Sequence, residues 1–347
     1  MRRFLLFPAF LSVILGALPG CVGQGAISPG AARELGPARA AQASEPISGS
    51  RFLLDTFCSI TLYGPPDGDL VSRALDLCGE YEALFSVSAE GGDIWRVNHA
   101  GGEPVEVSPR TADVVAAGIE YGYVSGGRFD ITVGRLTELW DFSQGSAVPN
   151  AEDIDEARET VDYRGVAVAG DTVRLLDSGA RLDLGGIAKG YIADRLADYL
   201  VDGGVTGAIV DLGGNVVAIG ERQDGKDWRI AVRSPFGGYG EYFGIIETGA
   251  ASIVTAGVYE RSFESGGELY HHILDPFTGY PARTDIVSAT VITETSMSGD
   301  ALSTMLILAG SEKAEGLLQG AEGFAGALLI KDDGEYIIIG NLNFEKL

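Results

Sequence analysis

The chain has 347 residues, of which 49 are Asp or Glu and 25 are Lys or Arg, so its formal net charge is −24. Nucleic acid and anionic membrane surfaces are poor partners for such a polyanion, because like charges repel. Hydrophobic residues make up 46% of the chain and charged residues 21%, which permits a buried core and excludes a disordered acidic tail. The 50 glycines are about twice the usual share of ~7%, and they follow no three-residue period. Collagen is therefore excluded, and many tight turns are expected.

Residues 1–20 have the pattern of a secretory signal peptide, because an apolar run over 4–18 follows two arginines and is too short for a lasting transmembrane helix. Cys21 comes directly after it and resembles the lipid-bearing cysteine of a lipoprotein. The alternative is an ordinary cleaved signal with an incidental cysteine. Residues 21–50 are rich in Gly, Ala, Ser and Pro and are predicted to be a flexible tether. We therefore expect a folded domain over 51–347 in an exported, membrane-anchored lipoprotein that faces the periplasm or the cell exterior.

Hydrophobic spacing predicts the elements of this domain. The stretch 51–63 alternates between polar and apolar residues and is predicted to be one strand. Apolar residues at helical spacing predict a helix over 70–85, and Ser108 before Pro109 predicts a second helix that ends at Ser125 before two glycines. Further helices are expected at 151–160, 188–201, 298–309 and 311–319, and further strands at 163–169, 172–176, 181–184, 207–221 (as two strands), 228–233, 243–248, 252–258, 286–293, 325–331 and 335–340. Because strands and helices mix without a regular βαβ rhythm, the predicted fold class is α+β, with mixed or antiparallel sheets and packed helices.

After Cys21 the chain has two more cysteines, Cys58 and Cys78, with no CxxC pair and no histidines at zinc-site spacing. The two cysteines could form a disulfide in an exported protein. A cysteine in an apolar strand and another on a helix face are more often small core residues, and we favour that interpretation.

The segment LDLGGIAKGY (182–191) is predicted to be the end of a strand, a two-glycine turn and the start of a helix. The N–H groups and the dipole at such a helix start attract anions, and glycines let a ligand touch the backbone. Lys189 lies in the first turn, where the dipole disfavours a cation, so a bound phosphate explains it better than helix stability does. The alternative is a plain turn with a solvated lysine, and the spacing alone does not decide between them.

Asp300 and Thr304 are four residues apart on a predicted helix, so their side-chain oxygens project from one face. A carboxylate and a hydroxyl are hard oxygen donors that suit Mg²⁺. An Asp near a helix N-terminus is also a common cap, and the motif taken alone favours that simpler interpretation.

Two further motifs place polar residues beside turns or apolar runs. In HILDPFTG, His272 and Asp275 adjoin an Asp-Pro-x-Thr-Gly turn signal. In GRFDITVG, Asp130 and Thr132 interrupt an apolar run, which suggests a ligand pocket with Trp140 as an aromatic wall. Packing of Trp140 in the core is the alternative.

Taken in order, these motifs resemble those of the ApbE-type flavin transferases, the FAD:protein FMN transferase family. The resemblance runs from about Phe52 to Asn341 and includes LDLGGIAKGY, DLGGN at 211–215, HILDPFTG and GDALSTM. It implies an ApbE-like fold with an FAD cleft between two subdomains. It also implies an exported enzyme that uses Mg²⁺ to transfer FMN from FAD to a Ser or Thr of a partner protein, with release of AMP.

The resemblance assigns roles to residues by position. The metal ligands are expected to be Asp300, Thr304 and the backbone carbonyl of Gly186. The proton acceptor is expected among His272, Asp275 and Asp300, and the sequence does not decide between them. The residues expected to contact or line the FAD substrate are Leu54, Asp55, Thr56, Ser88, Asp130, Ile131, Thr132, Asp183, Lys189 and Leu274.

The residue types fit this chemistry. A Mg²⁺ ion on Asp300 and Thr304 can bridge phosphates and act as a Lewis acid, with glycine-rich backbone and Lys189 as further donors. Two other functions use the same residues: a Mg²⁺-dependent FAD pyrophosphatase with water as the nucleophile, and a lipoprotein that binds FAD without turnover. The acceptor that the resemblance implies is a flavinylated subunit of a respiratory redox complex or an exported flavin-bearing protein.

Overall fold

A computed structural model describes residues 45–64, 69–142, 147–238 and 240–347, and residues Ala43–Leu347 form one compact unit. The predicted signal peptide, Cys21 and most of the predicted tether lie outside the described residues. The first strand begins at Ile47, so the folded domain starts a few residues before the predicted boundary at 51. Within the described ranges, no helix is both long enough and apolar enough to cross a membrane.

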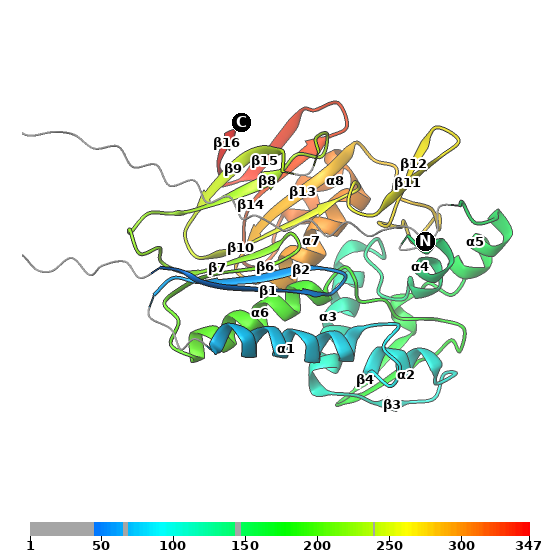
Figure 1. The fold of residues 1–347 in the computed structure, drawn as a ribbon. Helices are drawn as coiled ribbons and strands as arrows, with labels where there is room; N and C mark the ends of the chain where they lie inside the picture. The colour runs from blue at the N-terminus through cyan, green and yellow to red at the C-terminus, as the bar shows by residue number, and fades with distance from the viewer. Residues whose placement is uncertain (1–44, 65–68, 143–146, 239) are drawn as a thin grey trace, which may run out of the picture. The chain divides into compact units, whose positions relative to one another are not determined.

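The centre of the domain is an antiparallel sheet, which confirms the predicted fold class (Figure 1). In the described part of the chain it has eight strands in the order β1-β2-β6-β7-β10-β13-β14-β15, and each neighbouring pair is antiparallel. The strands are β1 (Ile47–Leu53), β2 (Thr56–Leu62), β6 (Gly207–Leu212), β7 (Asn215–Gly220), β10 (Ala251–Gly257), β13 (Ile286–Thr293), β14 (Phe324–Lys331) and β15 (Tyr336–Gly340).

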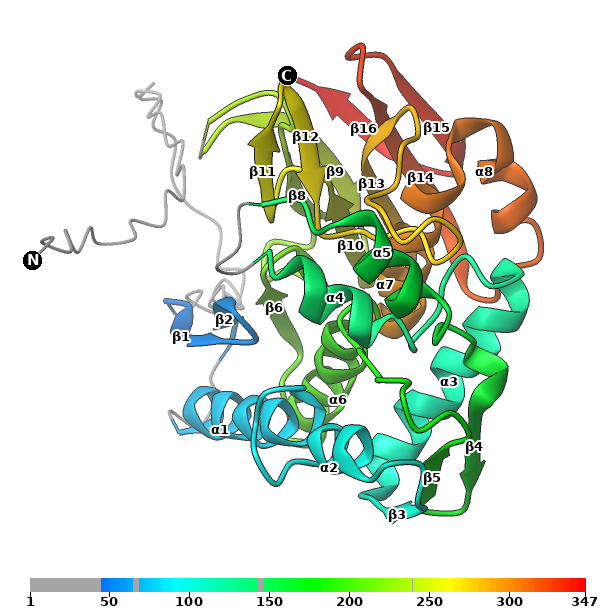
Figure 2. The same cartoon turned by 90° about the vertical axis from the view of Figure 1, so that its right-hand side faces the viewer.

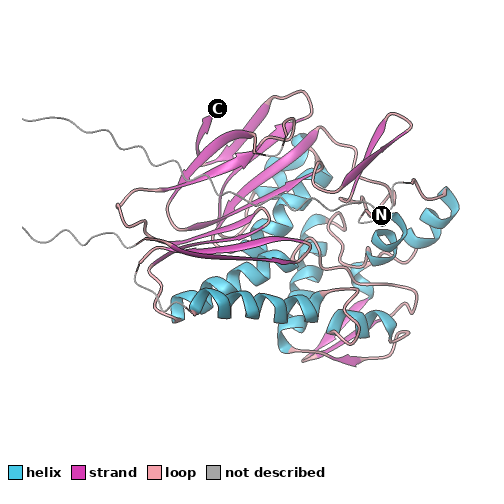
Figure 3. Cartoon of the chain, viewed as in Figure 1, coloured by secondary structure: helices cyan, strands magenta, loops and turns pink. Residues whose placement is uncertain are grey.

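Helices cover one face of this sheet, where Figure 3 shows them gathered below and behind the strands. They are α1 (Leu70–Phe85), α6 (Ala188–Asp202) and α7 (Ser296–Ala309), and α8 (Ser311–Leu318) packs on α7. The predicted helix over 70–85 is confirmed, and its apolar residues at helical spacing form the buried face. Cys78 on α1 and Cys58 on β2 are both buried and free, as favoured from the sequence.

A second, smaller sheet covers the opposite face of the main sheet, over the strands from β7 to β14. Its strands are β8 (Trp228–Arg233), β9 (Tyr242–Thr248) and β16 (Asn343–Lys346), in the order β16-β9-β8. Along β14, Ala327 and Leu329 join the core under the helices, whereas Leu328 and Ile330 join the core under the small sheet. Because both faces are covered there, β14 places apolar residues on both of its faces.

The rest of the domain packs beside these layers (Figure 2). It comprises α2 (Asp93–His99), α3 (Pro109–Ser125), α4 (Gly134–Trp140), α5 (Ala151–Arg158), a 3₁₀ turn at Tyr163–Gly165, the small sheet of β3 (Val105–Glu106), β5 (Thr172–Leu175) and β4 (Val166–Ala169), and the hairpin of β11 (Ser262–Ser265) and β12 (Glu268–His271). The predicted FAD cleft between two subdomains stays a prediction, since the described domain is one compact unit. The start of α3 is confirmed, because the Ser108 hydroxyl accepts from the N–H of Arg110 and Gly126 ends the helix with φ of 63°.

Two predicted strands are wrong. The stretch 51–63 is a hairpin of β1 and β2, because Leu54 and Asp55 both take positive φ (55° and 58°) and reverse the chain. Residues 181–184 form no strand and make one parallel bridge, between Val133 and Arg181. The neighbouring backbone is held by a side chain instead, since Asn98 bonds both the N–H and the carbonyl of Leu182.

Candidate functional site

The two-glycine turn before α6 brings the loop against α7. The Asp183 carboxylate accepts from the N–H of Gly185 at 2.8 Å and from the Thr137 hydroxyl at 2.7 Å, which fixes the turn. A Cβ on Gly186 would lie 2.9 Å from the Phe129 ring and 3.7 Å from Oγ1 of Thr304. A side chain at Gly186 would therefore require the Phe129 ring to move, and the Gly186 backbone lies near the Thr304 hydroxyl.

Asp300 is the buried acid of the site. Its side chain is 6% exposed, and Oδ2 accepts from the N–H of Gly190 at 2.9 Å in the first turn of α6. Burial raises the pKa of Asp300, and the nearby Lys189 ammonium opposes that shift. The amide of Asn215 also faces this carboxyl, but its Nδ2 makes no hydrogen bond of normal geometry with any described residue. The site thus holds an unpartnered buried donor beside a buried acid.

The turn between β6 and β7 connects this acid to the β1–β2 hairpin. A Cβ on Gly213 would overlap Oγ1 of Thr56, so the hairpin tip rests directly on that turn. A Cβ on Gly214 would lie 3.8 Å from Oε1 of Glu260, and the N–H of Gly214 donates to Asp211 at 3.2 Å. The predicted FAD-lining residues Leu54, Asp55 and Thr56 therefore lie at the same place as the glycine-rich turn.

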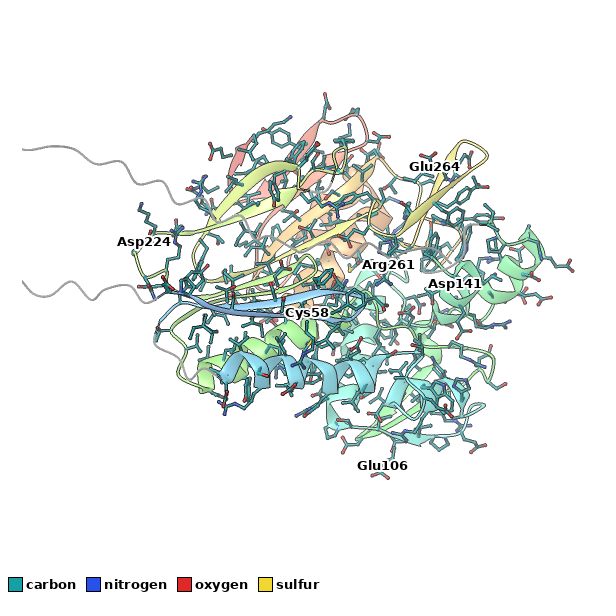
Figure 4. The ribbon with its side chains drawn as sticks, in the orientation of Figure 1. Cys58, Glu106, Asp141, Asp224, Arg261 and Glu264 are labelled. Carbon is teal, nitrogen blue, oxygen red and sulfur yellow. The ribbon has the colours of Figure 1, made fainter. Side chains whose placement is uncertain are left out.

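Two charged residues that sequence reasoning missed complete the site. Glu260 is exposed to solvent, yet protein surrounds its carboxyl closely, and burial raises its pKa against the pull of Lys189. Arg261 extends toward the hairpin tip, where Nη2 lies 3.5 Å from Oδ2 of Asp55, and Figure 4 labels it where the β11–β12 hairpin leaves the main sheet. No local sequence signal marks either residue, because both lie in the short link between β10 and β11.

The two adjacent histidines have different surroundings. His271 is held by the structure, since Nε2 bonds the carbonyl of Ala282 and Nδ1 pairs with the N–H of Ile273. In contrast, Nδ1 of His272 is buried and has no partner among the described residues. Burial lowers the pKa of His272 to about 3, with Arg261 and Lys189 adding to the shift, so the imidazole is neutral at pH 7.

Several predicted site residues also hold the backbone around the Asp183 turn. Asp130 accepts from the N–H and the hydroxyl of Thr132 and from the N–H of Tyr163. Ile131 is 1% exposed, and its carbonyl accepts from the N–H of Asp183 at 2.8 Å. The buried positions of 130–132 therefore hold the Asp183 turn in place.

Three other predicted residues have local structural contacts. The Asp275 carboxylate accepts from the N–H of Phe277 and organises the DPFTG turn. Leu274 is buried in a small core with Leu136 and Trp140, so Trp140 packs in a core, which was the alternative interpretation. Ser88 is exposed after α1 and shares a hydrogen bond with Ser86. Their predicted roles at the cofactor stay predictions.

The donor set favours a hard cation. Among the residues that the structure describes, no three His, Cys, Asp or Glu side chains converge as a metal cluster. Asp300 and Thr304 lie four residues apart on α7, and the Gly186 backbone lies near the Thr304 hydroxyl. The carboxylate, the hydroxyl and the backbone carbonyl all offer oxygen. Oxygen donors with room for further ligands suit Mg²⁺ better than zinc or copper. Beside them, Lys189 and the start of α6 offer positive charge for an anion.

Comparisons with known proteins place this arrangement among flavin-transferring enzymes. The profile of the ApbE family matches residues 54–328. A protein of Klebsiella pneumoniae named FAD:protein FMN transferase is 38% identical over 252 residues, covering 71% of this chain and 78% of that protein. Another of that name from Treponema pallidum is 32% identical over 306 residues, covering 82% and 84%.

Solved structures agree with the sequence comparison. The crystal structure of the ApbE protein from Thermotoga maritima has a TM-score of 0.77 at 30% identity, covering 84% of this chain and 96% of that one. The flavin transferase ApbE from Vibrio cholerae has a TM-score of 0.75 at 29% identity, covering 85% and 96%.

Proposed function

This chain belongs to the ApbE family and is a flavin transferase, and we propose that it moves FMN from FAD to a Ser or Thr hydroxyl of a partner protein with the help of Mg²⁺. The observation that carries the proposal is the convergence of Gly186, Asp300 and Thr304 beside Lys189. These residues come from two distant parts of the chain, and the fold brings them together at the start of α6.

The oxygens of Asp300, Thr304 and the Gly186 carbonyl would hold Mg²⁺, which when bound neutralises charge on the diphosphate and polarises it. The charges around the site support such a cation. Asp300 and Glu260 surround Lys189, so the ammonium alone does not make the site strongly positive for a diphosphate. The Asn215 amide, buried and unpartnered beside Asp300, is a further donor that a bound phosphate oxygen would satisfy.

His272 is the residue we assign as the proton acceptor. Its Nδ1 is buried and has no partner among the described residues, whereas one oxygen of Asp275 accepts from the N–H of Phe277 and one oxygen of Asp300 accepts from the N–H of Gly190. The acceptor oxygen gives its proton to His272 as it forms a bond to the FMN phosphorus, and the phosphorus–oxygen bond to AMP breaks. Lys189 stays beside the phosphates throughout and offsets their charge.

Export and lipid anchoring are part of the same proposal. They are supported by the signal-like residues 1–20 and by Cys21 directly after them. The acceptor we propose is a subunit of a respiratory redox complex or another exported flavin-bearing protein, because a lipid-anchored enzyme meets its partners at that side of the membrane.

The test is incubation of the protein with FAD, Mg²⁺ and a Ser/Thr peptide from a candidate flavoprotein. A peptide that carries FMN, formed with Mg²⁺ and lost with chelator, supports the proposal. Free FMN and AMP with unlabelled peptide would support a pyrophosphatase instead. Intact FAD that stays bound would contradict both enzymatic readings and leave a binding protein.

A further inference from the structure

The tip of the β1–β2 hairpin has an unfavourable backbone. Leu53 pairs with Thr56, so the loop is two residues long, and both of its residues have positive φ. Such a loop strongly prefers Asn-Gly or Asp-Gly, but here it is Leu54-Asp55. Asp tolerates this conformation, but a residue such as Leu54 holds it only where its surroundings support it, often at functional sites.

One contact from α1 supports this conformation directly. The N–H of Leu54 donates to Oε1 of Glu82 at 2.7 Å, in a partly buried position. Because Leu54 lies in the loop, this N–H is outside the β1–β2 ladder. A hydrogen bond to a carboxylate is among the stronger kinds. The Leu54 side chain also packs against the main core, but that contact does not involve the backbone N–H. The ion pair between Asp55 and Arg261 is 3.5 Å long and exposed, so it holds the tip only weakly.

We propose that Glu82 is a positioning residue for FAD, which acts by keeping the Leu54–Asp55 turn in its left-handed conformation at the edge of the site. The identity of the ligand rests on the proposed function. The turn reaches the site through Thr56, which lies against Gly213 in the same glycine-rich turn that carries Asn215 beside Asp300. Glu82 itself belongs to α1 and has no place in the transfer chemistry.

This role predicts a particular kinetic pattern. Without Glu82 the turn is free to relax, and FAD has to restore its conformation on binding, so affinity for FAD falls. Once FAD is bound the turn is restored, so the rate at saturating FAD and Mg²⁺ changes little. A purely structural role would instead lower the melting temperature without a selective effect on FAD affinity.

The test is a double-mutant cycle on the dissociation constant for FAD, measured by flavin fluorescence with Mg²⁺ present. Glu82→Ala should weaken binding about tenfold, which is about 1.4 kcal/mol, in the wild-type background. In a Leu54→Gly background the same change should cost less than about threefold, because glycine takes positive φ without support. The transfer rate at saturating FAD should stay within about twofold for Glu82→Ala.

Glu80→Ala is the matched control. Glu80 lies on the same helix, is exposed, and makes one long ion pair with Arg110 at 3.9 Å. It should bind FAD as the wild type does. If Glu82→Ala does not fold, Glu82→Asp takes its place, because the shorter side chain keeps the charge but falls short of the Leu54 N–H.

The inference is overturned if Glu82→Ala binds FAD like Glu80→Ala, or if its cost is the same in the Leu54→Gly background. The readout is binding and needs no acceptor. A wild-type protein that binds FAD but labels no acceptor would therefore defeat the proposed transfer, while the cycle would still decide the role of Glu82.

Discussion

Asp300 is both a proposed ligand of Mg²⁺ and a hydrogen-bond acceptor within the fold. The sequence offered a metal ligand and a helix cap as alternatives, and the structure shows that capping of a neighbouring helix is real. Oδ2 bonds the Gly190 N–H at the start of α6, and Thr304 lies on the same face of α7 beside Gly186. The two functions are compatible, because a carboxylate has several acceptor positions.

Substitutions at Asp300 should separate these functions. Asp300→Asn keeps an oxygen for the Gly190 N–H but loses the charge, so turnover should fall on the order of 100-fold with stability nearly unchanged. Asp300→Ala should lose the same activity and also about 1–3 kcal/mol of unfolding free energy, because a buried N–H is left unsatisfied. Transfer assays and urea unfolding of both variants measure this. Wild-type turnover in Asp300→Asn would contradict the metal assignment.

At the scale of elements, the junction of α6 and α7 builds the site. Asp194 on α6 accepts from the N–H groups of Ser296 and Met297 at 2.6 and 2.9 Å, which caps the start of α7. The carboxylate of Asp300 on α7 accepts a hydrogen bond from the N–H of Gly190 in the first turn of α6. Each helix thus caps the other, and the ligand oxygens lie where the two meet.

Gly190 sets the distance between these helices. A Cβ there would overlap the carbonyl oxygen of Ser296 and lie 2.6 Å from Cα of Met297, both of them backbone atoms. Gly190→Ala should therefore cost about 1–3 kcal/mol of stability, from overpacking, and weaken metal binding as Asp300 shifts. Gly316→Ala is the control, since Gly316 is helical with open space around it and should gain about 0.5–1 kcal/mol. Equal effects at the two positions in thermal and urea unfolding would refute the packing argument.

Asp194 should give the protein a recognisable pH dependence. Burial raises its pKa to about 6, above the 3.8 of a free Asp. The folded state therefore holds this proton more tightly than the unfolded state does. Its stabilising contribution is full below about pH 4 and is lost as the pH rises through 6, by up to about 3 kcal/mol. Asp194→Asn cannot titrate, so its unfolding free energy should lack this decline. Parallel pH curves for the two proteins would disprove the assignment.

At the scale of the whole molecule, the acidic chain is compatible with a phosphate-bearing substrate because positive charge is local. The net charge is −24, yet Lys189 and Arg261 lie at the site, next to glycine-rich turns. The acidic surface is left to keep the protein soluble and to disfavour nucleic acid. The excess of glycine also has local reasons, as the close approaches at 186, 190 and 213 show.

Membrane attachment is the whole-molecule property that a single change can test. If Cys21 carries the lipid, the wild-type protein should sediment with membranes after a high-salt wash, and Cys21→Ser should be released or remain as an unprocessed precursor. Cys58→Ser should leave attachment unchanged, because Cys58 is buried in the domain. Mature Cys21→Ser that stays on salt-washed membranes would count against the anchor.

The sequence predicts most of the domain because its signals are local. Ser108 with Pro109 and the glycines after Ser125 mark α3, and helical spacing marks α1. The prediction fails where residues distant in the sequence determine the local backbone conformation. Leu54-Asp55 carries no turn signal, and its conformation depends on Glu82. Helix α4 was not predicted from the sequence, because no polar residue caps its N-terminus.

The site follows the same rule. The spacing of Asp300 and Thr304 predicts them as site residues. Lys189 is predicted as a site residue because a cation is unfavourable in the first turn of a helix. Glu260 and Arg261 could not be found this way, because only the tertiary fold brings the link after β10 to the hairpin tip. The hydrogen bonds of Asp130 to Thr132 and Tyr163 could not be predicted either, because Tyr163 is distant in the sequence.

The most direct test of the account is the ratio of AMP released to peptide flavinylated, followed over one turnover with Mg²⁺, wild-type protein and Asp300→Asn in parallel. Transfer to a hydroxyl predicts equal amounts of AMP and FMN-peptide at every time for the wild type, and neither product above background for the variant. AMP that accumulates while the peptide stays unlabelled would contradict the claim that this site transfers FMN to a protein.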